Sequence, residues 1–300
     1  MHAAALPLSV SLAVLVAAVT HATWNAIAHG IKDQVLAFGL IGAGSIAASV
    51  PLVVLAPFPL GACWPYLLGS VFIHVFYNLL LMRSYQYGQF GQVYPLARGM
   101  SPLVVTVLAA AFAAERPAPP QIAGVLVVSC GLALLVLAGR RKSLNPVPRS
   151  GSGSGSVRAP GRAALIAAGA TGLTIAAYTT VDGLGVRLSG SATGYIGWLM
   201  LLESLCVPAW ALARRRDVVS GTSRRVLVSG VLAGVLSLLA YGLVLWAQTR
   251  GPLAPIAALR ESSVIFGAII ATVVFGEPFG RSRIAATVLV VLGVLLLSAR

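Results

Sequence analysis

The sequence predicts an all-α integral membrane protein whose ten transmembrane helices form two inverted five-helix repeats. The prediction rests on the composition, on a series of long apolar windows, and on residues that recur at one fixed offset. Of the 300 residues, 58% are hydrophobic and only 9% are charged, whereas a soluble domain carries about a quarter charged residues. So few charges cannot cover a water-facing surface, and lipid is therefore the expected solvent.

Each predicted span is a window of mostly apolar residues, because a helix that crosses the hydrocarbon core needs about 20 of them. The windows are 8–30, 35–56, 63–86, 91–114, 121–139, 163–186, 191–213, 226–249, 253–275 and 282–299. Proline-rich separators such as Pro117–Pro120 mark reversals, since proline cannot continue a helix interior. The first window lacks the basic start of a secretory signal, so we expect it to remain as a helix.

One stretch, residues 140–161, reads as a linker because it combines basic residues, prolines and Gly/Ser repeats. It separates two predicted units, a first repeat over 1–139 and a second over 162–300. Four pairs of residues support a duplication, since the members of every pair are 162 positions apart: Arg98 and Arg260, Ser101 and Ser263, Glu115 and Glu277, Gly131 and Gly293. Five spans take the chain across the membrane, so the second repeat is expected to enter inverted.

Several short motifs then support a family resemblance over essentially the whole chain. They are HATWNA, YPLARGMSP, AERP, AAYTTVDGLGVR and ALRESSVIFGAIIATVVFGEP. In their order and placement they resemble the EamA-like branch of the drug/metabolite transporter superfamily. The resemblance implies two inverted EamA-like five-helix repeats and movement of small metabolites across the bacterial inner membrane, often outward. It does not imply one particular substrate.

Arg98 and Arg260 are the informative charges, because each lies inside an apolar window. An arginine at the centre of a membrane costs about 3 kcal/mol on insertion scales and persists where it faces a wet cavity or a partner. In one interpretation the two arginines hold an anionic group of a substrate. In the other they pair with Asp182, Glu203 or Glu261 and fix helix packing, and the sequence leaves both open.

Prolines near these arginines indicate that the fourth and ninth spans are interrupted. Pro95 and Pro102 flank Arg98, and Pro252 and Pro255 precede Arg260. Interrupted helices at matching positions of two repeats point to a binding site. A simple kink for packing is the alternative.

Aromatic and polar side chains share helix faces in several spans and would suit a small organic ligand. Trp and Tyr also anchor helices at the membrane interface, which is the competing interpretation. His74 is interpreted as a hydrogen-bonded packing residue. With the charged residues, the candidate substrate-binding set is His21, Trp24, Asn25, Tyr77, Asn78, Arg98, Tyr178, Asp182, Tyr241, Trp246, Arg260 and Glu261.

The carboxylates divide into two groups by position. Glu261 and Asp182 lie inside spans, where proton exchange with water would couple proton entry to substrate exit. Glu115 and Glu277 close the fourth and ninth spans beside loops, and we interpret them as mainly structural.

The sequence contains no G-x-S-x-G, H-E-x-x-H or Walker A motif, which argues against a hydrolase, a zinc protease and a nucleotide-driven pump. Neither a cofactor nor a metal is expected, and Cys63, Cys130 and Cys206 are interpreted as packing residues. The net charge of +14 does not indicate nucleic acid, because the basic residues cluster in loops without interleaved aromatics.

The loop charges predict an orientation that conflicts with the family expectation. Basic residues gather in the loops at 32, 140–162, 214–225 and 281–283, and the other side carries only Arg116, Arg187, Arg250 and Arg300. The positive-inside rule then places both termini in the periplasm. The resemblance implies cytoplasmic termini.

These observations favour a multi-pass secondary transporter in the bacterial inner membrane that works by alternating access, by efflux or exchange, with proton coupling as a hypothesis. Its expected partners are a small-molecule substrate and the lipid bilayer, and monomer and homodimer both stay open. The rival functions are a lipid-head-group carrier or flippase, which would show an apolar groove open to lipid, and a multi-span enzyme that acts on lipid.

Overall fold

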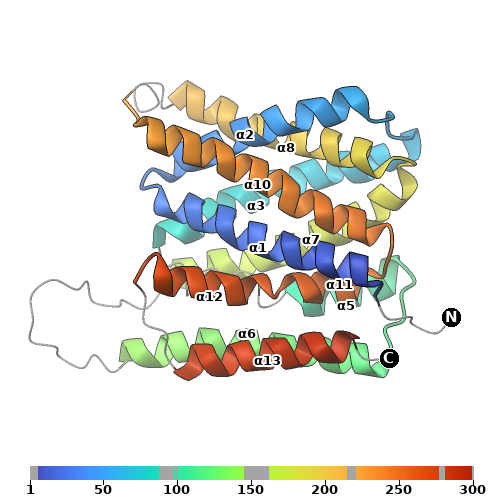
Figure 1. Cartoon of the computed structure of the whole chain (residues 1–300), viewed down its shortest axis with the longest axis vertical. Helices are drawn as coiled ribbons and strands as arrows, with labels where there is room; N and C mark the ends of the chain where they lie inside the picture. Colours follow the sequence, from blue (N-terminus) through green and yellow to red (C-terminus); the bar gives the residue numbers. More distant parts are fainter. Residues whose placement is uncertain are drawn as a thin grey trace, which may run out of the picture.

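A computed structural model describes residues 6–87, 98, 101–144, 162–214, 221–276 and 281–298. In this part of the chain the secondary structure is entirely helical, with no strand, and the helices lie side by side in one bundle (Figure 1). The bounds are α1 Leu8–Gly30, α2 Gln34–Leu55, η1 Gly61–Cys63, α3 Trp64–Tyr87, α5 Ser101–Phe112, α6 Pro119–Leu144, α7 Arg162–Leu188, α8 Ala192–Arg214, α10 Arg224–Gln248, α11 Leu253–Arg260, α12 Ser263–Val273 and α13 Arg281–Ser298.

The predicted all-helical membrane fold is confirmed. If α11 and α12 count as one interrupted span, the described helices form ten segments that match the ten predicted windows. Six helical segments of the described residues are long and apolar enough to cross a membrane, and three more apolar helices are shorter, at 101–112, 119–131 and 284–293. One boundary differs clearly from the sequence prediction. α6 continues to Leu144, past the predicted linker start at 140, because basic residues propagate a helix well. Part of window 91–114 lies outside the described residues.

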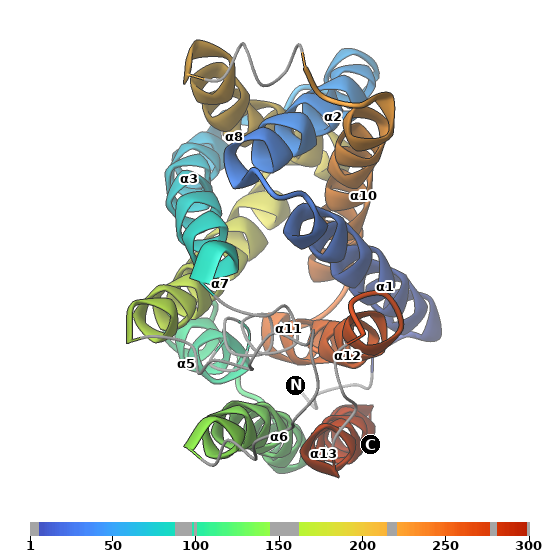
Figure 2. The same cartoon turned by 90° about the vertical axis from the view of Figure 1, so that its left-hand side faces the viewer.

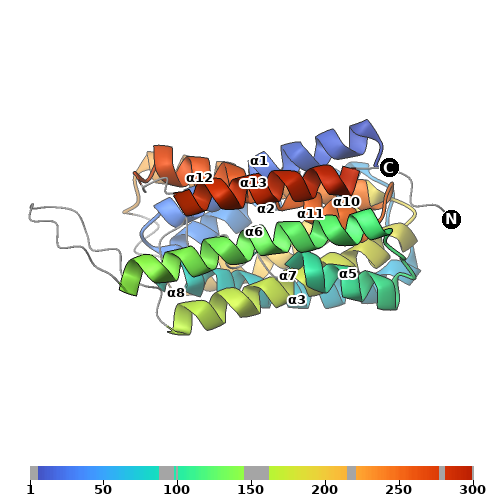
Figure 3. The same ribbon diagram turned by 90° about the horizontal axis from the view of Figure 1, so that it is seen from below.

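Helix packing follows a two-fold pattern that relates the two halves of the chain. α1 packs on α10 and α12, and the corresponding helices of the other half, α7 on α3 and α5, pack in the same way. α2 lies against its counterpart α8, and α6 lies against its counterpart α13 (Figure 2). The members of the α6–α13 pair run in opposite directions (Figure 3), as an inverted repeat requires.

Two matched glycines show this relationship at atomic level. A Cβ atom on Gly131 of α6 would lie 2.9 Å from Leu289 Cβ of α13, and a Cβ atom on Gly293 of α13 would lie 2.8 Å from the carbonyl oxygen of Gly124 in α6. Only glycine allows the two backbones to approach this closely, as is common between helices in lipid. The glycine pair found at the fixed offset in the sequence therefore has the same packing role in both halves.

The outer surface of the bundle is apolar. Large hydrophobic side chains such as Leu12, Phe72, Val107 and Val273 are exposed on different helices. A soluble protein would bury such side chains against a partner, whereas lipid tails solvate them directly.

The ninth span is interrupted, as predicted, but not at its prolines. Pro252 is the N-cap of α11 and Pro255 lies in its first turn, positions at which the missing proline N–H costs no helical hydrogen bond. The break follows Arg260, where the amides of Glu261 and Ser262 donate three residues back, to Ala258 and Leu259. This tighter turn separates α11 from α12. The matching segment around Arg98 lies mostly outside the described residues, so the predicted interruption of the fourth span remains a prediction.

Candidate functional site

A cavity lies between the two halves of the chain and is lined by α1, α2 and α3 of the first half and α7, α8 and α10 of the second. Its volume is about 50 Å³, counted as space that the centre of a water molecule can reach, which is room for several waters. On α1 it is lined by His21 and Trp24, and on α2 by Phe38, Ile41, Gly42 and Ser45. Six of the predicted site residues line it: His21, Trp24, Tyr77, Asn78, Tyr178 and Tyr241.

An aromatic cluster forms one wall of the cavity around Tyr178. The ring of Tyr178 stacks on His74, with centroids 4.0 Å apart and 27° between the planes. Tyr77 and Tyr241 meet the same ring edge-on at 5.3 and 5.5 Å. These contacts come from α3, α7 and α10, so the cluster also joins the two halves.

Arg98 is buried and makes a two-point ion pair across the halves. Its Nε donates to Glu261 Oε2 at 2.7 Å and its Nη2 donates to Glu261 Oε1 at 2.9 Å. Its Nη1 lies 2.6 Å from His21 Nε2. Because a guanidinium can only donate, His21 Nε2 is the acceptor in this contact. Of the two interpretations of Arg98, its contacts therefore agree with ion pairing that fixes helix packing, and the partner is Glu261.

Arg260 is equally buried, with 1% of its surface exposed, but it is not paired in this way. None of its three guanidinium nitrogens has a hydrogen-bond partner among the described residues. Tyr178 lies near enough for its oxygen to interact electrostatically with the guanidinium, although the two do not meet hydrogen-bond geometry. A buried guanidinium without an acceptor is costly, and it is available to an anionic group.

Asp182 is fully buried and accepts hydrogen bonds from two tyrosines. The hydroxyl of Tyr195 donates to Oδ1 at 2.8 Å and the hydroxyl of Tyr241 donates to Oδ2 at 2.5 Å. Tyr241 also lines the cavity, whereas Asp182 does not line it and contacts a lining residue through the hydrogen bond from Tyr241. Asp182 therefore acts on the cavity through the position of Tyr241.

Two predicted site residues have other surroundings. Asn25 donates from Nδ2 to the carbonyl oxygen of His21 at 2.8 Å and accepts from the Tyr85 hydroxyl, which ties α1 to α3. Trp246 lies near the end of α10 with the Arg250 guanidinium 4.0 Å above its ring. Neither side chain lines the cavity, and Trp246 matches the alternative of an interface anchor.

Among the lining residues that the sequence analysis left out of the binding set, two have titratable side chains. His74 was assigned to packing, and Glu203 was considered only as a partner for an arginine. Both line the cavity, and His74 Nε2 lies 3.4 Å from Glu203 Oε2. The sequence contained one indication that Glu203 has a functional role, because it is the only carboxylate inside the window 191–213.

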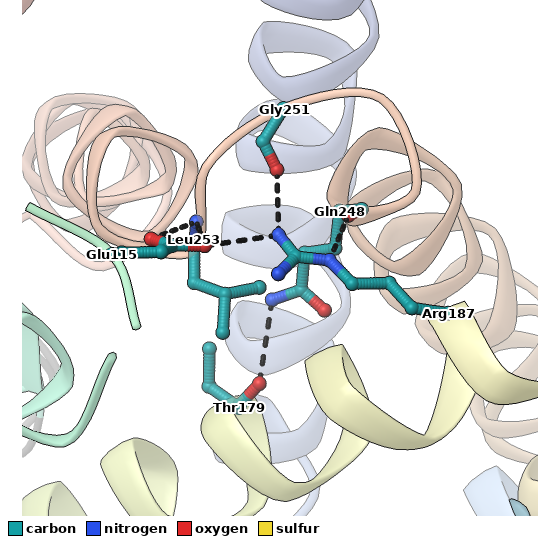
Figure 4. A network of polar contacts seen from close by, with 6 residues as sticks. All are labelled: Glu115, Thr179, Arg187, Gln248, Gly251 and Leu253. Carbon is teal, nitrogen blue, oxygen red and sulfur yellow. Dashed lines mark hydrogen bonds and ion pairs between the residues drawn. The ribbon is translucent and has the colours of Figure 1, made fainter. Parts of the chain in front are cut away.

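A separate polar network, which we call the terminal staple, consists of Glu115, Arg187, Gln248, Gly251 and Leu253 (Figure 4). The Glu115 carboxylate accepts from the Leu253 backbone N–H at 2.8 and 3.0 Å and from Arg187 Nη2 at 3.0 Å. Arg187 also donates to the carbonyl oxygens of Gln248 and Gly251, each at 2.9 Å. The staple joins the ends of α5, α7 and α10 to the start of α11, so the interpretation of Glu115 as structural agrees with its contacts.

The staple lies at one end of the bundle, and the cavity lies farther inside it. A Cβ atom on Gly251 would lie 2.8 Å from Leu6, just before α1 begins, whereas the cavity is lined from the inner parts of its helices, for example by His74 of α3 and Glu203 of α8. Within the described residues, no group of three or more His, Cys, Asp or Glu side chains is arranged to hold a metal ion.

Comparison with protein families identifies the second half of the chain. Residues 162–299 match the sequence profile of the EamA-like transporter family. This half belongs to the EamA-like transporter family. The EamA-like family indicates a membrane transporter of small molecules, so the chain is a multi-pass membrane protein, in agreement with its apolar helices.

The EamA-like assignment is accompanied by a match to a solved structure over almost the full length. That structure, titled only "Crystal structure of protein", is 16% identical, covers 96% of each chain and has a TM-score of 0.64. At this identity the similarity shows the fold alone. No curated protein sequence matches the chain.

Proposed function

We propose that the protein is a secondary transporter that moves a small organic metabolite across the bacterial inner membrane by alternating access, by efflux or exchange. The observation that carries the proposal is a cavity, lined by apolar, aromatic and a few polar side chains, between two halves that pack with two-fold symmetry. Such a site at the interface of inverted repeats can be exposed to either side when one half rocks against the other.

Two further features support alternating access. The terminal staple holds four helix ends together at the end where α1 begins, so the protein is closed there. The cavity lies farther inside the bundle. Exposing it at the stapled end requires the staple to break, and the interrupted span α11–α12 provides a point at which a helix can bend.

Arg260 suggests that the substrate carries an acidic group. Its guanidinium is buried beside the cavity wall at Tyr178 and has no hydrogen-bond acceptor among the described residues. A carboxylate or phosphonate would supply the missing acceptor oxygens in a two-point contact. In this proposal Arg98 does not bind the acidic group of the substrate, because its guanidinium is already ion-paired with Glu261.

The cavity chemistry does not favour a lipid-head-group carrier. Histidine, asparagine, glutamate, serine and tyrosine side chains line the cavity together with apolar ones. A carrier of lipids would need an apolar groove that continues to the bilayer.

The test is flux into proteoliposomes that contain the purified protein, with a labelled panel of organic acids, zwitterions, amines and neutral compounds. We expect saturable transport of at least one acid or zwitterion. Arg260→Gln should lower that transport at least about tenfold, as loss of a charged hydrogen-bonded contact of 1.4 kcal/mol or more implies. Arg250→Gln, which removes an exposed arginine outside the cavity, is the matched control. Absence of flux for the whole panel would overturn the transporter proposal, and unchanged acid transport in Arg260→Gln would overturn the role of Arg260.

A further inference from the structure

Glu203 is a buried carboxylate in the cavity wall that the contacts above leave incompletely satisfied. It lies in the middle of α8 with 7% of its surface exposed. Its Oε2 atom has no hydrogen-bond partner among the described residues, although His74 Nε2 is 3.4 Å away. A buried carboxylate oxygen without a donor is costly, so the site requires a donor at this point.

The hydrogen bonds of His74 explain why its ring does not provide that donor. His74 Nδ1 lies 3.0 Å from both the carbonyl oxygen and the hydroxyl oxygen of Ser70. The carbonyl oxygen only accepts and the hydroxyl oxygen can accept as well, so we assign the proton to Nδ1. In the neutral imidazole the lone pair is then on Nε2, which faces Glu203 Oε2. When Glu203 is ionised, two acceptors therefore face each other across a gap that an N–H group from a ligand would bridge.

The rest of the cavity matches a positively charged nitrogen. Trp24, Tyr77, Tyr178 and Tyr241 line the same space, and the faces of aromatic rings attract cations. Among the lining side chains of the described residues, Glu203 is the single carboxylate. Arg260 is not part of the lining, so it does not contact a cation placed between Glu203 and His74.

We propose that Glu203 and His74 bind the protonated amine of the transported molecule, with the aromatic side chains enclosing it. This inference rests on the proposed function, because it names the substrate class of the same cavity. With Arg260 nearby, a molecule that has an ammonium group and an acidic group would meet an opposite charge at each. The ammonium would donate one N–H to Glu203 Oε2 and another to His74 Nε2.

Binding to the full-length protein in lipid nanodiscs tests the proposal with three probes of one shape: benzylamine, benzyl alcohol and benzoate. We expect saturable binding of benzylamine by calorimetry and binding of benzyl alcohol that is at least tenfold weaker. Glu203→Gln should weaken benzylamine at least tenfold, and Glu203→Asp, which keeps the charge, should retain the preference for the amine. Asp33→Asn is the matched control, because Asp33 caps α2 outside the cavity and asparagine caps equally well.

Three results would overturn the assignment: no binding of benzylamine, equal binding of the amine and the alcohol, or unchanged benzylamine binding in a folded Glu203→Gln protein. The wild-type comparison of the three probes needs no variant and stands even if Glu203→Gln does not fold. Transport in proteoliposomes separates the two proposals. Glu203-dependent amine binding without flux would contradict only the transporter, and flux that is unchanged in Glu203→Gln would contradict only the amine site.

Discussion

Arg98 and Glu261 are 163 positions apart in the chain and form a two-point ion pair in which both side chains are almost completely buried. One comes from the first half and the other lies in the break of the ninth span. Their contact therefore fixes how the interrupted span sits against the first half.

Removing one partner of this pair is expected to destabilise the protein strongly. Arg98→Met leaves the Glu261 carboxylate buried without its counter-charge, which costs about 3–5 kcal/mol. The double variant Arg98→Met/Glu261→Gln should lose less stability than the two single losses added together. Thermal unfolding of the purified variants measures this, and additive losses would mean that the two groups are not energetically coupled.

Gly293→Ala is expected to destabilise the α6–α13 contact. The added methyl would meet Gly124 O and the amide nitrogen of Val128, both at 2.8 Å, and overpacking of this kind costs about 1–3 kcal/mol. Gly169→Ala is the matched control, because its Cβ has nothing within 4 Å and helix propensity should stabilise it by about 0.5–1 kcal/mol. Equal thermal stability of the two variants would contradict the close contact.

Arg187→Gln is expected to loosen the closed end of the bundle, since it removes charge-assisted hydrogen bonds to three groups. Cys63 reports this, because it is buried in η1, which packs on α7. In a Cys130→Ala/Cys206→Ala background, a maleimide should label Cys63 several times faster after the Arg187 change. An unchanged labelling rate would show that the staple does not hold that end closed.

Asp182→Asn and Glu261→Gln are expected to impair transport driven by a pH gradient, because proton coupling requires a carboxylate that can gain and lose a proton inside the spans. Flux with and without a pH gradient in proteoliposomes measures the effect, with Asp33→Asn as a carboxylate control outside the cavity. Undiminished pH-driven flux in both variants would eliminate these two residues as proton carriers.

The loop charges predict an outward C-terminus. α1 begins and α13 ends at the same end of the bundle (Figure 1), so one reporter decides the orientation of both. A phosphatase fused after Arg300 should be active if the basic loops are cytoplasmic. Fluorescence of a cytoplasm-dependent reporter at the same place would instead support the orientation that the family resemblance implies.

Hydropathy predicted most of the fold, because the bilayer fixes the length of a span and makes apolar runs conspicuous. It also predicted that Arg98 and Arg260 would be buried, since both lie within such runs. It could not predict that Arg98 pairs with Glu261 while Arg260 has no such partner. Residues 260 and 261 are adjacent, but their side chains have different surroundings because the helix breaks between α11 and α12. Tertiary packing determines the geometry of that break.

The site was predicted less completely, for a similar reason. Helix faces correctly brought His21 and Trp24 together, because i and i+3 spacing is local. Trp246 was assigned to the ligand site from residue type alone, but its position near the end of α10 places it beside Arg250. Glu203 and His74 meet across α8 and α3, a contact between distant segments that no local pattern encodes.

The burial of Arg260 also constrains how the protein is made. The ninth span is synthesised almost last, and a guanidinium near the middle of an isolated hydrophobic helix resists partition into the bilayer by about 2.5–3.5 kcal/mol. Stable insertion of this span therefore depends on earlier helices that already surround it. Biogenesis of the second half is accordingly coupled to the presence of the first, and the halves expressed as separate chains should accumulate only when they are made together.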